Sequence, residues 1–153
     1  MSSLTAEYAL RAVVLLGANL GSPRTTQQIA EQTRVPSGYL SKVLQALGRA
    51  GVVESQRGLN GGFVLARPPN DLTVLDVINA VDPLERIARC PLGIGEHADR
   101  LCPLHRRLDQ GIAEMEAIFR ETTIAQLFAD QDMSRPLCVT VAHDKPEPRS
   151  GRG

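Results

Sequence analysis

Four side chains that bind soft metals lie close together near the middle of the chain. They are Cys90, His97, Cys102 and His105, in the pattern C-x6-H-x4-C-x2-H. Thiolate and imidazole are common ligands of iron–sulfur clusters and zinc, and a folded loop can bring all four to one metal. The spacing is not that of a standard zinc finger. The other interpretation is a loop stiffened by Pro91 and Pro103, in which the cysteines are small apolar groups and the histidines are exposed.

An enzyme is the alternative from a different class of function. Cys102 and His105 are close enough in sequence to act as a thiol nucleophile and its base. The sequence supplies no third orienting group, oxyanion hole or deep pocket for such a reaction. An odd number of cysteines, three, also argues against a disulfide framework. These residues are therefore better interpreted as a binding or sensing site.

Length and composition set the scale of the fold. The chain has 153 residues, with 42% hydrophobic and only 3% aromatic side chains, and a core of Leu, Val, Ile and Ala favours helices packed on helices. No stretch approaches the ~20 apolar residues that span a bilayer. The start, Met1-Ser2-Ser3-Leu4, lacks the pattern of a signal peptide. We expect a cytoplasmic protein of one compact domain with an appendage.

Hydrophobic periodicity and helix caps predict the elements that position the metal-binding side chains. Helices are expected over about 4–20, a short stretch after Thr25, 37–50, 73–81, 103–121 and 124–129. Capping boxes are predicted at Thr25 with Gln28 and at Thr73 with Asp76. Ser37 is the expected cap of the third helix, and Gly51 is expected to end it in a left-handed conformation.

Two short strands are predicted after the third helix, over 52–55 and 63–66. The turn between them is rich in glycine and contains Asn60-Gly61, a strong hairpin signal. Two short helices joined by a tight turn and followed by such a hairpin indicate a winged helix-turn-helix. The predicted fold class is therefore mainly α, with a small β-wing and a long C-terminal dimerisation helix.

A winged helix-turn-helix suggests DNA binding. One helix fits the major groove, and a short basic wing reaches phosphate or the minor groove. The polar face of the third helix carries the candidate contacts Ser37, Tyr39, Ser41, Lys42 and Gln45, and Arg57 lies at the wing tip. The alternative is a winged helix that binds proteins, in which the basic residues are ordinary solvated charge.

The charge distribution favours DNA binding, although the formal net charge is zero. Residues 24–67 carry six basic groups against two acidic ones, whereas ten basic and twelve acidic groups follow residue 81. This is the balance expected when one part of the molecule faces phosphate and the other does not.

Several short stretches also resemble a known family. They are Glu7-Tyr8-Ala9-Leu10-Arg11-Ala12, Gly38-Tyr39-Leu40-Ser41-Lys42-Val43-Leu44, Ala50-Gly51-Val52-Val53, Arg57-Gly58-Leu59-Asn60-Gly61-Gly62-Phe63 and Leu65-Ala66-Arg67-Pro68-Pro69. The chain resembles the Rrf-type transcription regulators from residue 1 to about 130. That family includes the iron–sulfur cluster regulator and the nitric-oxide-sensitive repressor. The resemblance implies a homodimer that binds double-stranded DNA at a palindromic operator, with contacts from Tyr39, Ser41, Lys42 and Arg57, as a regulator that is expected to be a repressor.

The resemblance also implies a set of cluster ligands. Cys90 and Cys102 match the outer pair of the family's three loop cysteines, and His105 matches a histidine ligand position. Glu7 matches a position from which some relatives supply a carboxylate to the partner subunit. The middle cysteine is missing here, with Glu96 and His97 near its place, so His97 is a weaker candidate. A site with two cysteines, histidine and glutamate favours a [2Fe–2S] cluster that senses redox state, nitric oxide or iron.

Three alternatives to this sensing site remain open within the same fold. The site binds zinc, responds through its thiols alone, or binds no cofactor and responds to a small molecule or partner protein. Cys138 is a further candidate for the missing thiolate, although a free thiol is the simpler interpretation.

Apolar residues also recur every three or four positions along the predicted long helix. They are Leu104, Leu108, Ile112, Met115 and Phe119. This stripe is too long for one short terminal helix to cover, so we expect it to pair with a second chain; packing within its own chain is the alternative. The predicted organisation is a DNA-binding domain over 1–82, a sensing loop over 83–102, dimerisation helices over 103–130 and a disordered tail over 131–153.

Overall fold

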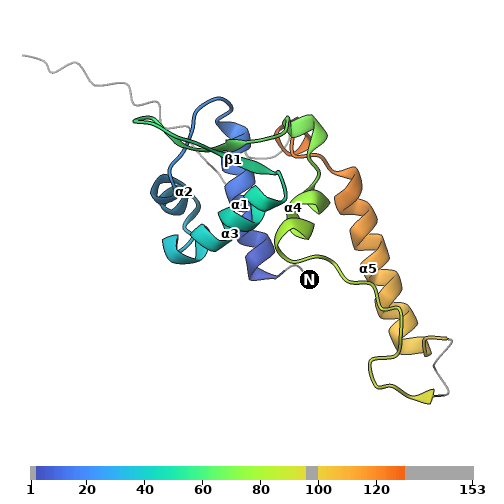
Figure 1. The fold of residues 1–153 in the computed structure, drawn as a ribbon. Helices are drawn as coiled ribbons and strands as arrows, with labels where there is room; N and C mark the ends of the chain where they lie inside the picture. The colour runs from blue at the N-terminus through green and yellow to red at the C-terminus, as the bar shows by residue number, and fades with distance from the viewer. Residues whose placement is uncertain (1–2, 96–99, 130–153) are drawn as a thin grey trace, which may run out of the picture.

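Helix α1 (Leu4–Ala18) lies at the centre of the fold (Figure 1). The computed structural model describes residues 3–95 and 100–129. Both faces of α1 carry fully or almost fully buried side chains, as its apolar sequence predicts. They are Ala6, Ala9, Ala12, Val13, Val14, Leu15 and Leu16. Three helices, α2 (Thr26–Thr33), α3 (Ser37–Arg49) and α4 (Val74–Val81), pack around α1 and share one core with it.

The end of α1 differs from the prediction by two residues, because α1 stops at Ala18 rather than Leu20. The Asn19 side chain donates a hydrogen bond to the Leu15 carbonyl oxygen at 2.8 Å and accepts one from Arg24 at 2.8 Å. A side chain that competes for helix carbonyls in this way favours a helix end. Arg24 is thereby fixed beside the end of α1.

The helix-turn-helix consists of α2 (Thr26–Thr33) and α3 (Ser37–Arg49). The capping box of Thr25 and Gln28 is confirmed, and Arg34 makes the tight turn in a left-handed conformation with φ 56°. The prediction that Ser37 caps α3 is wrong, because Pro36 occupies the cap and Ser37 is the first helical residue. Gly51 follows the helix with φ 71°, as expected.

The wing is an antiparallel pair of β1 (Val53–Gln56) and β2 (Gly62–Leu65). The predicted hairpin is confirmed, with each strand shifted by about one residue. Its loop takes positive φ at Gly58 and Gly62 rather than at Asn60-Gly61, so the Asn-Gly pair does not form the turn. Arg24 and Phe63 exchange backbone hydrogen bonds of 3.1 and 2.7 Å, which join the wing to the segment before α2.

The remaining helices connect the wing to a long outer helix. A 3-10 turn, η1 (Pro69–Asp71), precedes α4 (Val74–Val81), whose Thr73–Asp76 capping box is confirmed. Helix α5 (Pro103–Glu121) has the predicted bounds and runs along the outside of the molecule (Figure 1). Helix α6 (Gln126–Ala129) begins later than predicted, because Thr123 and Gln126 cap it by reciprocal hydrogen bonds.

The C-terminal end of α5 is anchored in the core of the winged domain. Thr73 and Thr123 form an isolated antiparallel bridge, and Ile124 is completely buried. Gly17 of α1 faces this anchor, because a Cβ at that position would lie 3.2 Å from the Phe128 ring. This attachment is made by residues that follow α5, because the helix itself contains no buried residue. Within the described ranges, no helix is long and apolar enough to cross a membrane.

Candidate DNA-binding surface and metal-ligating loop

Helix α3 has one buried face and one exposed polar face. Leu40, Val43, Leu44 and Leu47 are buried, as the sequence pattern predicts. The opposite face exposes Ser37, Ser41, Lys42 and Gln45. The Ser41 hydroxyl donates a hydrogen bond of 3.2 Å to the Ser37 carbonyl oxygen and keeps its lone pairs available. Hydroxyl, amide and ammonium groups on an exposed helix face are suited to reading base edges and phosphates.

Tyr39 lies at the side of this face and contacts α1. Its hydroxyl lies 2.5 Å from the Thr5 hydroxyl, and its ring meets the Tyr8 ring edge-on at 5.5 Å between centroids. The side chain is 41% exposed. Tyr39 therefore fixes α3 on α1 and still presents part of its ring to solvent, a double role that the sequence did not reveal.

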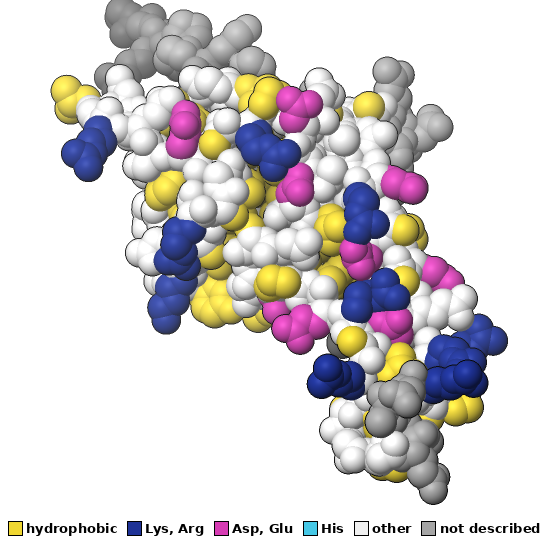
Figure 2. All heavy atoms as spheres, turned by 45° about the vertical axis from the view of Figure 1, so that its right-hand side comes forward, with side chains coloured by type: hydrophobic (Ala, Val, Ile, Leu, Met, Phe, Trp, Pro, Cys, Tyr) yellow, Lys and Arg dark blue, Asp and Glu magenta, His cyan; other side chains and the backbone are white. Residues whose placement is uncertain are grey.

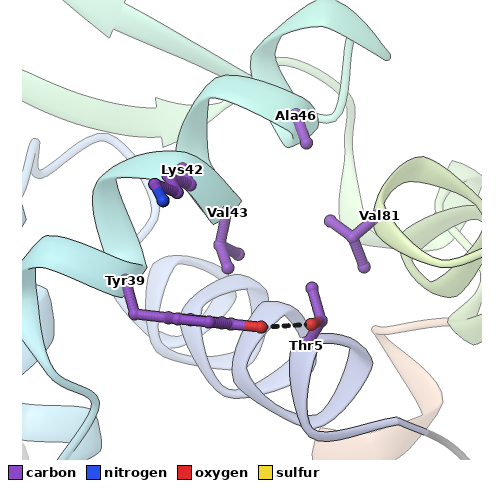
Figure 3. Close-up of a pocket in the computed structure, with 6 residues that line it drawn as sticks. All are labelled: Thr5, Tyr39, Lys42, Val43, Ala46 and Val81. Atoms are coloured by element: carbon purple, nitrogen blue, oxygen red, sulfur yellow. Dashed lines mark hydrogen bonds between the residues drawn. The ribbon is translucent and has the colours of Figure 1, made fainter.

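A small pocket opens where α1, α3 and α4 meet (Figure 3). Its volume is about 180 Å³. It is lined by Thr5, Tyr39, Lys42, Val43, Ala46 and Val81. Figure 3 shows the Tyr39–Thr5 hydrogen bond at one side and Val81 of α4 facing α3 across the opening. The pocket thus lies at the seam between the candidate recognition helix and the helix that leads to the metal-ligating loop.

The tip of the wing is built so that backbone and one basic side chain can approach a ligand. Arg57 is exposed, and Leu59 is fully exposed. Gly58 adopts φ 120° and Gly62 φ 151°, conformations that strongly favour glycine. A Cβ at Gly62 would lie 2.5 Å from the Arg24 carbonyl oxygen, so glycine is needed for the wing to meet the Arg24 backbone.

Replacing Gly62 with alanine is expected to lower the free energy of unfolding by about 2 kcal/mol, because the new methyl group combines a steric clash with a strained backbone. Thermal unfolding measures the effect. Gly48→Ala in helix α3 is the matched control, since a Cβ at Gly48 would make only an ordinary contact of 3.9 Å with the Val53 carbonyl oxygen. Equal melting temperatures for Gly62→Ala and the wild-type protein would contradict the described wing.

Glu7 lies in the first turn of α1 and is engaged within its own chain. Its carboxylate accepts a hydrogen bond from Arg11 Nε at 3.0 Å, and Arg11 also lies over the Tyr8 ring at 5.6 Å. The Glu7 side chain is 47% exposed. It is therefore accessible to a second chain, and a metal would have to compete with Arg11 for it.

The structure brings two of the predicted metal ligands together. Cys102 precedes α5 as its cap residue, and its Sγ lies 3.3 Å from Nδ1 of His105 one turn later. Both side chains are half-buried, as is Cys90. In the described part of the chain, no three His, Cys, Asp or Glu side chains are grouped as a metal site. Cys90 and Glu7 are thus not assembled with the Cys102–His105 pair, and His97, Glu96 and Cys138 lie outside the described residues.

An ion pair that the sequence pattern did not indicate joins the loop to α5. Arg86 donates two hydrogen bonds to the two Asp109 carboxylate oxygens, each at 2.7 Å, and the Ile87 backbone N–H donates a third at 2.9 Å. The Arg86 hydrogen bonds lower the pKa of Asp109, partial burial opposes this shift, and the Ile87 hydrogen bond adds to it. Hydrogen bonds to Asp109 likewise raise the pKa of Arg86.

The apolar stripe of α5 is exposed in its N-terminal part. Leu104 and Leu108 are 63% and 50% exposed, and Ile118, which the predicted stripe omitted, is 62% exposed. Ile112, Met115 and Phe119 are half-buried, and Phe119 packs against the core, so their own chain covers part of the middle and C-terminal stripe.

The exposed polar helix, the glycine-rich wing and the helical core define a winged helix-turn-helix DNA-binding regulator. Comparison with known proteins gives the family. Residues 2–130 match the Rrf2 family model, described as an iron-dependent transcriptional regulator. The chain belongs to the Rrf2 family of transcription regulators.

Individual relatives agree with this assignment. An Aquifex aeolicus protein described as a helix-turn-helix-type transcriptional regulator is 32% identical over 126 residues, which cover 80% of this chain and 88% of the relative. The solved structure of IscR from T. potens has a TM-score of 0.70 and 27% identity, and covers 85% of this chain and 87% of that chain.

A second solved structure is that of CymR, the global cysteine regulator of B. subtilis. Its TM-score is 0.68 at 25% identity, with 82% of this chain and 93% of that chain covered. These relatives are regulators and not enzymes, so the thiol-enzyme alternative is set aside.

Proposed function

We propose that this regulator is a homodimeric repressor that binds a palindromic operator and senses redox state, nitric oxide or iron through an iron–sulfur cluster. The observation that carries the DNA-binding part is the exposed polar face of α3 next to a wing whose glycines present Arg57. Ser37, Tyr39, Ser41 and Lys42 act from α3 in the major groove. Arg57 acts from the wing on phosphate or the minor groove.

Exposure of the α5 stripe supports the homodimer. Leu104, Leu108 and Ile118 are each at least half exposed on one long helix that contains no buried residue. Pairing of α5 with the same helix of a second chain removes this apolar surface from water, which is the main driving force of association. Binding to a palindromic site requires that this pairing place the two α3 helices on one side of the dimer.

The dimer has a direct test. Sedimentation equilibrium of the wild-type protein at micromolar concentration should give twice the chain mass, and Leu108→Glu should shift the protein toward monomer by placing a charge in the interface. Glu114→Gln, which changes an exposed side chain of the same helix, should leave the dimer intact. A monomeric wild-type protein would contradict the proposal.

The proposed cluster ligands are Cys90, Cys102 and His105, with Glu7 of the partner subunit as the fourth and His97 as a weaker candidate. The donor chemistry fits an iron–sulfur cluster, because Cys102 and His105 already lie 3.3 Å apart and both are ligands of such clusters. A [2Fe–2S] cluster with histidine in place of cysteine supplies one-electron redox chemistry at a raised potential. For a cluster to bind, Cys90 must join the Cys102–His105 pair, and the Glu7 carboxylate must exchange its contact with Arg11 for one with the metal.

A regulator without a cluster is the second candidate. It is favoured by the lack of any assembled group of three ligands among the described residues and by the similarity to a global cysteine regulator. In that case the Cys102–His105 pair binds zinc with other ligands or responds as a thiol, or the signal is a small molecule or protein. Iron, sulfide and zinc analysis of protein purified without oxygen separates these cases.

A further inference from the structure

The segment that enters the metal-ligating loop has no core of its own to hold it. Between α4 and residue 95, every side chain is exposed or half-buried. It is attached first at Leu84, whose side chain packs against the core and whose N–H donates a hydrogen bond of 3.2 Å to the Asn79 side chain at the end of α4. Beyond Ile87, no hydrogen bond or ion pair between described residues attaches this segment to another element. The hydrogen bonds and the ion pair that attach the segment carrying Cys90 therefore lie at or before Ile87.

Asp109 of α5 receives three hydrogen bonds from this segment. Two come from the Arg86 guanidinium in a bidentate arrangement and one from the Ile87 backbone N–H. The Asp109 side chain is only 18% exposed, although Arg86 is 48% exposed. An exposed ion pair alone contributes little, but a bidentate guanidinium–carboxylate pair with a backbone hydrogen bond fixes both distance and direction.

A second carboxylate orients Arg86. Glu116 lies two turns further along α5, with its Oε2 4.0 Å from Nη1 of Arg86, and it also pairs with Arg120. The guanidinium is thus held along the axis of α5 between two carboxylates. Figure 2 shows basic and acidic side chains alternating along this side of the molecule.

The direction of the chain makes this contact relevant to the cysteines. After Arg86, the segment runs alongside α5 toward the helix start (Figure 1). Four extended residues from Arg86 to Cys90 reach at most about 14 Å. From Asp109 back along the helix, His105 is about 6 Å and Cys102 about 10 Å away. A chain held at Asp109 can therefore deliver Cys90 to the Cys102–His105 pair.

We infer that Arg86 and Asp109 are positioning residues that hold the loop on α5 so that Cys90 can join Cys102 and His105. Neither side chain binds the metal. This inference rests on the proposed function, because Cys90, Cys102 and His105 are cluster ligands only in that proposal. The Arg86–Asp109 ion pair itself does not depend on a metal. The loop is thus held by an ion pair with the outer helix α5, because the segment that leads into it has no buried side chain.

Asp109→Asn tests the inference, because the amide keeps the shape but cannot accept two charge-assisted hydrogen bonds from Arg86. In metal-free protein, we expect the Ile87 amide to exchange hydrogen about tenfold faster and Cys90 to react faster with iodoacetamide relative to Cys102. In protein loaded with iron and sulfide, the visible chromophore should be lost faster. Glu114→Gln is the control, since among the described residues its carboxylate contacts Gln110 on the same helix.

A charge-swapped variant distinguishes positioning from general stability. Arg86→Asp combined with Asp109→Arg should restore part of the Cys90 protection that either single change removes, but not the slow exchange at Ile87, because arginine cannot accept the Ile87 hydrogen bond. The inference is overturned if Asp109→Asn leaves exchange at Ile87 and the Cys90-to-Cys102 reactivity ratio unchanged. It is also overturned if exchange rises while that ratio stays the same. Hydrogen exchange at Ile87 and the Cys90-to-Cys102 reactivity ratio are both measured on metal-free protein. If the wild-type protein binds no iron, the proposed cluster is contradicted, but these two measurements still test the positioning role of Arg86 and Asp109.

Discussion

Replacing Arg57 with alanine is expected to weaken operator binding by about tenfold and to flatten its salt dependence. Arg57 is exposed at the tip of a wing that glycines and the Arg24 backbone hold in place. A guanidinium that neutralises one phosphate releases about one counterion, so its loss reduces the slope of log K against log salt by about one. Fluorescence anisotropy titrations at several salt concentrations measure both effects.

The control for Arg57→Ala is Arg107→Ala, which removes the same charge from an exposed position on α5. That variant should bind the operator with unchanged salt slope, because its charge is remote from the wing. An unchanged titration for Arg57→Ala would show that the wing does not contact DNA. A parallel change in both variants would mean that net charge, and not the wing contact, governs binding.

Cys90→Ala and Cys102→Ala are each expected to abolish the visible chromophore of protein prepared without oxygen and with ample iron. Each change removes a thiolate, and the proposed site has only two. Glu7→Ala should leave a chromophore of altered spectrum or stability, and His97→Ala should change it only if His97 is a ligand. Visible absorption spectra with iron and sulfide analysis provide the measurement.

Cys138→Ala is the matched control for the two cysteine variants. It removes the third thiol of the chain, which lies outside the described residues, and should leave the chromophore intact. Loss of colour in Cys138→Ala would instead identify Cys138 as the missing thiolate ligand. Colourless wild-type protein without sulfide would refute the cluster, and zinc or thiol sensing would become the better account.

Elements with local signals were predictable from sequence. Helix α5 begins and ends where its apolar period and Pro103 indicated, and the Thr25 and Thr73 capping boxes formed as expected. These features depend on residues within one turn of each other. Ser37 was wrongly predicted as a cap, since a serine can also start the helix itself when proline precedes it. The Asn60-Gly61 turn signal failed because Gly58 and Gly62 take the left-handed conformations instead.

The candidate site was predictable only in part, because its contacts join distant segments. Cys102 and His105 lie one helical turn apart, so their pairing follows from sequence. The Tyr39–Thr5 hydrogen bond and the Arg86–Asp109 ion pair join residues 34 and 23 positions apart. No periodicity identifies such partners, since charged and hydroxyl side chains occur at many exposed positions.

Selection of bound DNA from a random library by the purified dimer is the most direct test of the central claim, operator recognition by paired α3 helices and wings. The enriched fragments should share an inverted repeat, with half-site centres about one helical turn apart, roughly 10 base pairs. Enrichment should disappear when Arg57 and Lys42 are both replaced by alanine. Recovery of fragments with no common sequence would contradict the claim that this protein reads a palindromic operator.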